Sequence, residues 1–178
     1  MTTCQCNNHT VHHGHSICQN NIRNYWGQRL WRLLHKLTYD LMCNQVNVDV
    51  YSKFFECVVP CLLPCGNCKN HYLRYVHYFP IKNVCIVDWL LRIHNIINFN
   101  EKKPLWTRVQ ADSYYNTYKA HADFIEMRRY YFGLLKEDKI TRECYDTFVR
   151  VFLLVIPPPP PTPCGSVCNP CVKPCGEL

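Results

Sequence analysis

The sequence predicts an all-α fold: a four-helix bundle that is followed by a helical extension and flanked by flexible tails. Apolar residues recur every three or four positions in four successive segments, which is the spacing that puts them on one face of a helix. Short connections join the segments, as in antiparallel bundles. No stretch between them has the alternating pattern of a strand. These three observations together favour a helical bundle.

Each expected helix is located by its apolar stripe and by the proline that limits it. Pro60 should end or kink the second helix, because proline lacks the amide hydrogen and crowds the preceding turn. Pro80 closes the third helix, and the fourth stops before Pro104. The four stripes run from Trp26 to Leu41, from Val50 to Cys61, from Cys68 to Phe79 and from Ile86 to Ile97.

Composition divides the chain into four parts. Residues 1–20 are rich in cysteine and histidine and poor in apolar side chains, so we expect a flexible tail. Residues 21–107 hold the bundle, and residues 108–156 form an aromatic-rich helical extension that serves as a dimer contact or as a docking surface for a substrate protein. Residues 157–178 combine a polyproline spacer with a cysteine-rich tail that is too short to bury a core.

Charge and hydropathy exclude several classes of protein. The net charge of +7 is spread along the chain without a block of five like charges, so we expect no nucleic-acid partner. The longest apolar run, residues 148–156, is far shorter than the roughly 20 residues that span a bilayer. We therefore expect no membrane span and a cytoplasmic location, where thiols stay reduced. In that setting fourteen cysteines indicate catalysis or metal binding rather than structural disulfides.

A Cys-x-x-Cys motif, Cys65 to Cys68, opens the third helix directly after Pro64. This position places the second thiol over the positive end of the helix dipole, which favours a thiolate and a redox-active pair. The same spacing also supplies half of a zinc site. A thioredoxin-like interpretation needs a strand before the helix, and none is predicted here. A redox dithiol within helices needs an electron acceptor, which indicates a bound cofactor.

Side chains suited to such a cofactor lie on the first and fourth helices. Trp31 and His35 are four residues apart and face away from the leucine stripe, and His94 and Asn98 have the same spacing with Asn95 beside them. Aromatic, imidazole and amide groups can stack on a planar heteroaromatic ring and form hydrogen bonds with it. The alternative is that Trp31 and His94 are ordinary core residues.

Three ordered blocks between residues 25 and 106 resemble the FAD-linked sulfhydryl oxidases of the Erv/ALR type. The short tryptophan-glycine start and His71 look most like the versions of large cytoplasmic DNA viruses such as iridoviruses and asfarviruses, which would place the chain in the host cytoplasm and in the virion. The blocks are Trp26-Gly27-x-x-Leu30-Trp31-x-x-Leu34-His35, then Pro64-Cys65-Gly66-Asn67-Cys68-x-x-His71, and Trp89-x-x-x-x-His94-Asn95-x-Ile97-Asn98 with Lys103-Pro104.

The resemblance implies a bundle with FAD at one end, a homodimer packed through the first two helices, and the oxidation of thiol-containing proteins by O2 to give disulfides and H2O2. It places Trp31 and His35 against the flavin or the adenine, and Lys103 against the pyrophosphate. The other cofactor-binding positions that it implies are Gly27, Arg29, Tyr39, His71, His94, Asn95, Ile97, Asn98 and Trp106.

Exchange chemistry and the resemblance together assign roles within the dithiol. The first cysteine of a pair that opens a helix is the more exposed, so Cys65 should form the mixed disulfide with the substrate. Cys68, one turn further in, should face the flavin. Cys57, Cys61 and Cys85 are expected to be buried core thiols.

Cysteines in the two tails are candidates for a relay between the substrate and the dithiol. The alternative for the C-terminal four is a zinc site, and it belongs to a rival function: a zinc-stabilised basic module that binds nucleic acid or protein. No metal is expected at the dithiol itself. The relay candidates are Cys4, Cys6, Cys164, Cys168, Cys171 and Cys175.

Overall fold

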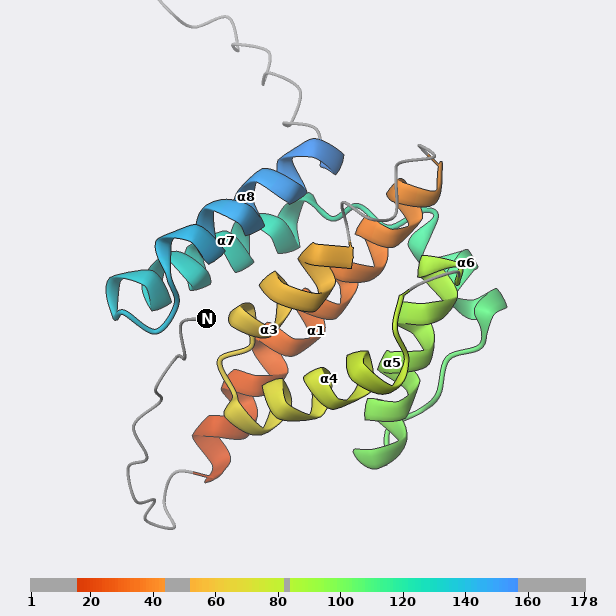
Figure 1. Ribbon diagram of the computed structural model, residues 1–178, viewed down its shortest axis with the longest axis horizontal. Helices are drawn as coiled ribbons and strands as arrows, with labels where there is room; N and C mark the ends of the chain where they lie inside the picture. The colour runs from red at the N-terminus through yellow and green to blue at the C-terminus, as the bar shows by residue number, and fades with distance from the viewer. Residues whose placement is uncertain (1–15, 44–51, 82–83, 157–178) are drawn as a thin grey trace, which may run out of the picture.

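The computed structural model describes residues 16–43, 52–81 and 84–156, and every regular element in these ranges is a helix. The prediction of an all-α fold is therefore confirmed. The tail residues 1–15 and 157–178, with the six relay candidates, lie outside the described residues. The elements are α1 (Ser16–Cys43), η1 (Phe54–Val58), α3 (Val59–Leu62), α4 (Gly66–Tyr78), α5 (Ile86–Asn100), α6 (Arg108–Tyr115), α7 (His121–Lys136) and α8 (Arg142–Val155) (Figure 1).

Helix α1 runs through the middle of the molecule. It packs against α5 and α6 on one side and against α7 and α8 on the other (Figure 1). Its leucines fill the centre of the core, with Leu33 and Leu37 completely buried. The helix begins at Ser16, within the range 1–20 that the sequence predicts as a tail. No proline or glycine lies between Ser16 and Trp26, and polar side chains alone do not stop a helix.

The second predicted helix is irregular, and its buried face differs from the prediction. A π-helical turn, η1, leads directly into α3, and Pro60 sits in the first turn of α3, where a missing amide hydrogen has little cost. A π turn adds a residue and rotates the positions that follow it. Cys57 and Cys61 are consequently exposed, which contradicts their predicted place in the core. The buried side chains are instead Phe54, Phe55, Val59, Pro60 and Leu62.

Helices α4 and α5 agree with the sequence prediction. Helix α4 ends at Tyr78, two residues before Pro80, and the indole nitrogen of Trp89 on α5 donates a hydrogen bond of 2.6 Å to the carbonyl of Phe79. Cys85 is the exception, because it is exposed rather than buried. It occupies the N-cap position of α5, just before the buried stripe of that helix begins at Ile86.

The extension shares one hydrophobic core with the bundle. Helices α7 and α8 cover α1, and α8 also covers η1 and α3. Phe152 of α8 meets Phe54 of η1 edge to face, with ring centroids 6.1 Å apart. Polar contacts add to this packing, since the guanidinium of Arg32 forms two hydrogen bonds of 2.6 and 3.0 Å with Asp123. Among the described helices, none has the length and apolar character that a membrane crossing requires.

Candidate functional site

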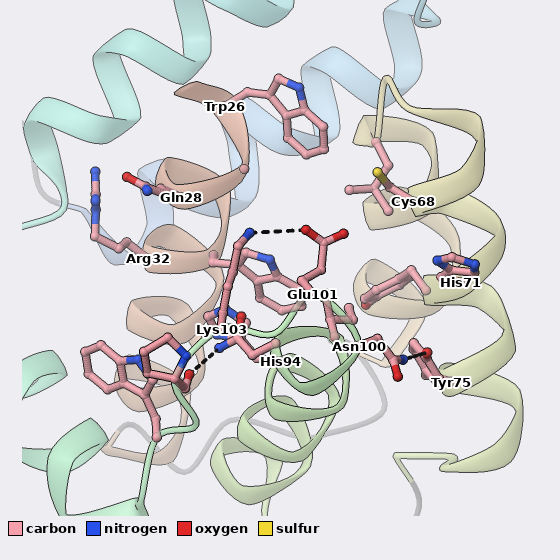
Figure 2. Close-up of a pocket in the computed structure, with 18 of the residues that line it drawn as sticks. Trp26, Gln28, Arg32, Cys68, His71, Tyr75, His94, Asn100, Glu101 and Lys103 are labelled. Atoms are coloured by element: carbon pink, nitrogen blue, oxygen red, sulfur yellow. Dashed lines mark hydrogen bonds and ion pairs between the residues drawn. The ribbon is translucent and has the colours of Figure 1, made fainter. Parts of the chain in front are cut away.

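A cavity of about 530 Å³ lies between α1, α4, α5 and the segment that follows α5. Figure 2 shows Trp26, Gln28 and Arg32 of α1 on one side and Cys68, His71 and Tyr75 of α4 on the other. Its volume is within the range of pockets that hold small molecules and cofactors. The predicted cofactor-binding residues that line it are Gly27, Trp31, His71, His94, Ile97, Asn98, Lys103 and Trp106.

Inside this cavity an aromatic stack connects α1 and α5, the first and fourth predicted helices. The rings of Trp31 and His94 are stacked, with centroids 4.1 Å apart and an interplanar angle of 5°. Behind them, Nε2 of His35 lies 2.9 Å from Nδ1 of His94, and the His35 ring stacks on Tyr115 at 4.6 Å. The structure therefore brings these predicted side chains together and shows the order in which they contact one another.

Burial keeps both imidazoles of this group neutral. It lowers the pKa of His35 well below the ordinary 6.5, and the neighbouring His94 lowers it further. Burial also lowers the pKa of His94 to about 4, with a smaller contribution from the charge of Lys103. Nδ1 of His35 is buried without a hydrogen-bond partner. Because an orphaned buried N–H is the rarer case, the geometry favours His35 as donor to His94, which leaves His94 with its own N–H at Nε2.

Two asparagines of α5 fix the segment that carries Lys103 and Trp106. The side-chain amide of Asn95 donates to the carbonyl of Trp106 at 2.7 Å and accepts from the Trp106 amide at 2.9 Å. Asn98 donates to the carbonyl of Pro104 at 3.3 Å. These bonds hold the segment against α5, so that Lys103 and Trp106 line the cavity.

The cations of the cavity wall come from two elements. Lys103 pairs with Glu101 of the same turn, with Nζ and Oε2 separated by 3.4 Å. Arg32 is held from behind by Asp123 of α7. Both side chains line the cavity, so it has positive charge available for an anionic ligand.

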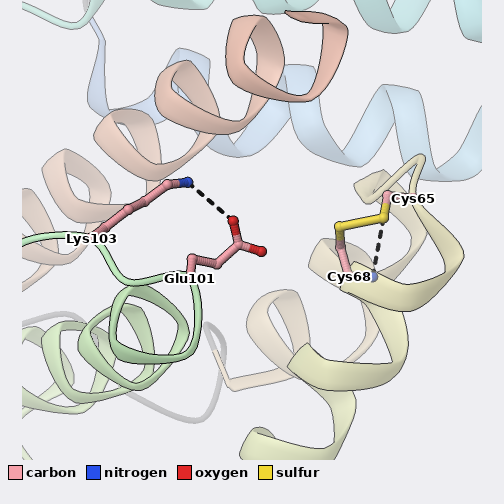
Figure 3. The surroundings of a disulfide bond; sticks show 4 residues. All are labelled: Cys65, Cys68, Glu101 and Lys103. Carbon is pink, nitrogen blue, oxygen red and sulfur yellow. Dashed lines mark hydrogen bonds and ion pairs between the residues drawn. A yellow bond between two sulfur atoms is a disulfide. The ribbon is translucent and has the colours of Figure 1, made fainter. Parts of the chain in front are cut away.

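Cys65 and Cys68 form a disulfide at the start of α4, with their Cα atoms 5.2 Å apart (Figure 3). Cys68 lines the cavity, whereas Cys65 is not part of its wall. The predicted capping geometry needs a correction: Cys65 is the N-cap residue, and its sulfur accepts a hydrogen bond of 3.3 Å from the amide of Cys68. The positive end of the helix dipole thus acts on the sulfur of Cys65 rather than on that of Cys68.

Four predicted cofactor-binding residues lie outside the cavity wall. His35 is behind His94, and Asn95 is occupied with Trp106. Arg29 lies against the ring of Tyr25 and 3.6 Å from Asp123. Tyr39 donates a hydrogen bond of 2.6 Å to Asp112 of α6. The structure therefore gives each of these four side chains a protein partner instead of a place in the cavity wall.

Sequence reasoning missed several residues of the cavity wall. Tyr72 and Tyr75 were assigned to the core stripe of α4, and a stripe pattern cannot show that its edge borders a cavity. Tyr114 and Tyr115 belong to α6 of the extension, whose position follows only from tertiary packing. The complete set of missed residues is Trp26, Gln28, Arg32, Leu63, Tyr72, Tyr75, Asn100, Glu101, Pro104, Tyr114 and Tyr115.

The rival zinc module uses Cys65 and Cys68 as metal ligands. In the structure these two sulfurs are bonded to each other. Across residues 16–43, 52–81 and 84–156, no three histidine, cysteine, aspartate or glutamate side chains gather as metal ligands. The cysteine clusters of the two tails lie outside this part of the chain.

Comparison with known proteins gives one similarity. The chain is 27% identical, over 94 residues, to a protein of Acanthamoeba polyphaga mimivirus described as a probable FAD-linked sulfhydryl oxidase. The match covers 48% of this chain and 65% of the mimivirus protein, which is less than two thirds of that relative's length. No family model matches the chain. No solved structure matches it either.

Proposed function

We propose that this protein is an FAD-dependent sulfhydryl oxidase that forms disulfides in thiol-containing proteins with O2 as the final acceptor. The observation that carries the proposal is the Cys65–Cys68 disulfide, whose inner cysteine forms part of the wall of a large aromatic cavity. Such a cavity can hold an electron acceptor next to a dithiol. The similarity to the mimivirus protein supports the same activity.

The residues of the cavity fit FAD. The stacked pair of Trp31 and His94 offers a flat surface to an aromatic ring system, and Trp106 and Tyr114 add further aromatic surface in the same wall. Lys103 and Arg32 can meet the two negative charges of the diphosphate. Gly27 lines the cavity, and a Cβ atom added to it would have no protein atom within 4 Å. We therefore expect a side chain at this position to project into the space that the ligand needs.

The dithiol chemistry proceeds in two exchange steps. A substrate thiolate attacks the sulfur of Cys65, which forms a mixed disulfide and releases the sulfur of Cys68 as a thiolate. A second substrate thiolate then attacks the substrate sulfur of the mixed disulfide and releases Cys65. The substrate gains a disulfide, and the enzyme pair gains two electrons. The amide of Cys68 and the α4 dipole stabilise the negative charge on Cys65 as it leaves.

FAD, when bound, supplies the two-electron oxidant that restores the Cys65–Cys68 disulfide, and O2 accepts the electrons to give H2O2. The residues of the protein would position the flavin and shield it from water. The neutral His94 presents a hydrogen-bond donor to the ligand, and its partner His35 holds that orientation. Trp31 and Ile97 line the same cavity and would shield a bound ring from water.

A homodimer, a relay through the tail cysteines and a cytoplasmic location stay predictions. The structure limits one of them. Helices α7 and α8 of the same chain cover α1 and α3, so a dimer through the first two helices would have to use the part of their surface that this pair leaves open.

Oxygen consumption with dithiothreitol as electron donor tests the proposed function. The wild-type protein supplied with FAD should consume O2 and produce H2O2, and Cys68→Ser should fall to the background rate while still binding FAD. Cys144→Ser, a thiol on α8, is the matched control and should keep full activity. Undiminished turnover in Cys68→Ser would contradict the role of the dithiol.

A further inference from the structure

Helices α5 and α7 end in two turns of the same type. Lys102 and Asp138 follow the C-cap glutamates with positive φ angles of 55° and 53°. The next amide in each turn returns to the last helical turn, from Lys103 to the Asn98 carbonyl at 2.8 Å and from Lys139 to the Leu134 carbonyl at 2.9 Å.

In both turns the reversal of the chain places a glutamate beside a lysine. Glu101 pairs with Lys103 at 3.4 Å, and Glu137 pairs with Lys139 at 2.6 Å. The ion pair is therefore a product of the local turn and needs no other part of the protein. Each pair alone contributes little to stability, because its side chains are at least partly exposed to solvent.

The two pairs differ in where they lie. Glu101 and Lys103 both line the cavity, whereas the pair at the end of α7 is on the outer surface, with side chains 59% and 63% exposed. Figure 3 shows the carboxylate of Glu101 between the ammonium of Lys103 and the Cys65–Cys68 disulfide. The carboxylate of Glu101 is therefore paired with the ammonium of Lys103, the cation that an anionic ligand would bind.

We infer that Glu101 sets the affinity of the cavity for anionic flavins, because it competes with the cofactor's phosphate groups for Lys103. This inference rests on the proposed function. An incoming diphosphate must displace the carboxylate from Lys103 and then remains close to its charge. At the screening expected in a partly open site, removing that charge should strengthen binding of FAD by about three- to tenfold. A flavin without phosphate gains nothing from the same change.

Equilibrium titration of the full-length, flavin-free protein with FAD and with riboflavin tests the inference. Glu101→Gln should bind FAD about three- to tenfold more tightly than the wild type at low ionic strength, and the difference should shrink in high salt. Its affinity for riboflavin should be unchanged. Glu137→Gln removes the same ion pair from the same kind of turn, so it should match the wild type with both ligands.

The outcomes separate the two claims. A wild type that binds neither flavin contradicts the proposed function. A wild type that binds FAD while Glu101→Gln binds it equally or more weakly overturns the role of Glu101. An equal gain for riboflavin also overturns it, because that gain would come from shape rather than charge. Thermal unfolding without ligand provides the structural check, and the two glutamine variants should melt within a degree or two of each other.

Discussion

At the scale of single residues, the buried imidazoles of His35 and His94 make the free energy of unfolding depend on pH. Both imidazoles have a pKa below the ordinary 6.5, because burial disfavours the charged ring, and for His94 the pKa is about 4. As the pH falls below 6.5, the unfolded chain binds protons that the folded protein refuses. The two rings therefore lower the free energy of unfolding as the pH falls toward 4. Above about pH 7 they are neutral in both states and make no pH-dependent contribution.

Urea denaturation at a series of pH values measures this effect. Between pH 6.5 and 5 the wild type should lose about 2 kcal/mol or more from the two rings together. His94→Gln should have a flatter profile over that interval, whereas His77→Gln, on the exposed face of α4, should keep the wild-type slope. A wild type whose stability is constant over this range would show that the pair is not held neutral.

Gly27 provides a second test at the residue scale. A leucine at this position should enter the cavity, because Gly27 lines the cavity and nothing in the protein lies within 4 Å of the added Cβ. Gly27→Leu should therefore lower FAD affinity by at least tenfold and leave the fold intact, with a gain of about 0.5 to 1 kcal/mol from helix propensity. The measurements are flavin titration and thermal unfolding.

Gly133→Leu in α7 is the matched control. Gly133 is also within a helix and also has open space around an added Cβ, but it is not part of the cavity wall. It should show the gain in stability without the loss of affinity. Normal FAD binding by Gly27→Leu would place the ligand elsewhere.

Among single residues, the sequence could predict which side chains lie in the cavity wall where their own helix defines their position. Trp31, His94 and Cys68 were predicted because aromatic, imidazole and thiol groups stand at helical spacing. His35 carries an imidazole and Asn95 an amide at similar spacing, yet both contact other protein groups rather than the cavity. A helical repeat gives the direction of a side chain, but it does not give the depth at which a neighbour intervenes.

At the scale of elements, the ion pairs between α1 and α7 connect the extension to the cavity wall. Asp123 receives two hydrogen bonds from Arg32 and one from the hydroxyl of Tyr118. Although burial raises the pKa of Asp123, these hydrogen bonds hold it below the ordinary value. The carboxylate is therefore charged at neutral pH and keeps the guanidinium of Arg32 in place.

Asp123→Asn should destabilise the protein by about 1 to 3 kcal/mol, because it removes a partly buried, charge-assisted pair and leaves Arg32 without its counter-charge. Asp146→Asn is the comparison, since Asp146 forms an exposed pair with Arg142 at 3.9 Å and should change stability by less than about 0.5 kcal/mol. Chemical denaturation of both variants gives the answer. Equal and negligible effects would contradict a linking role for Asp123.

The boundaries of α4 and α5 were predictable, because periodic apolar stripes and prolines define them. The π turn before Pro60 was not, and it moved Cys57 and Cys61 from the predicted core to the surface. One extra residue in a helical turn leaves no mark on composition or spacing. The packing of α7 and α8 on α1 could not be predicted either, since an apolar stripe shows that a helix face is buried without showing which element covers it.

At the scale of the whole molecule, the extension should be indispensable to the bundle. Helices α7 and α8 cover α1, and α8 covers η1 and α3, with Phe148 and Phe152 almost fully buried. A chain that ends at residue 107 would expose this apolar surface to water. We expect it to aggregate or to associate with a second copy. Sedimentation of the truncated and full-length chains measures this, and a truncated chain that is monomeric and equally stable would contradict it.

The central claim is that the Cys65–Cys68 pair exchanges electrons with an FAD bound in the adjacent cavity. The visible absorption spectrum of the full-length protein, purified with FAD supplied and titrated with dithiothreitol without oxygen, tests it most directly. We expect a yellow protein whose flavin bands bleach as dithiol is added and return when air is admitted. A colourless protein, or a bound flavin that dithiol does not reduce, would contradict the account.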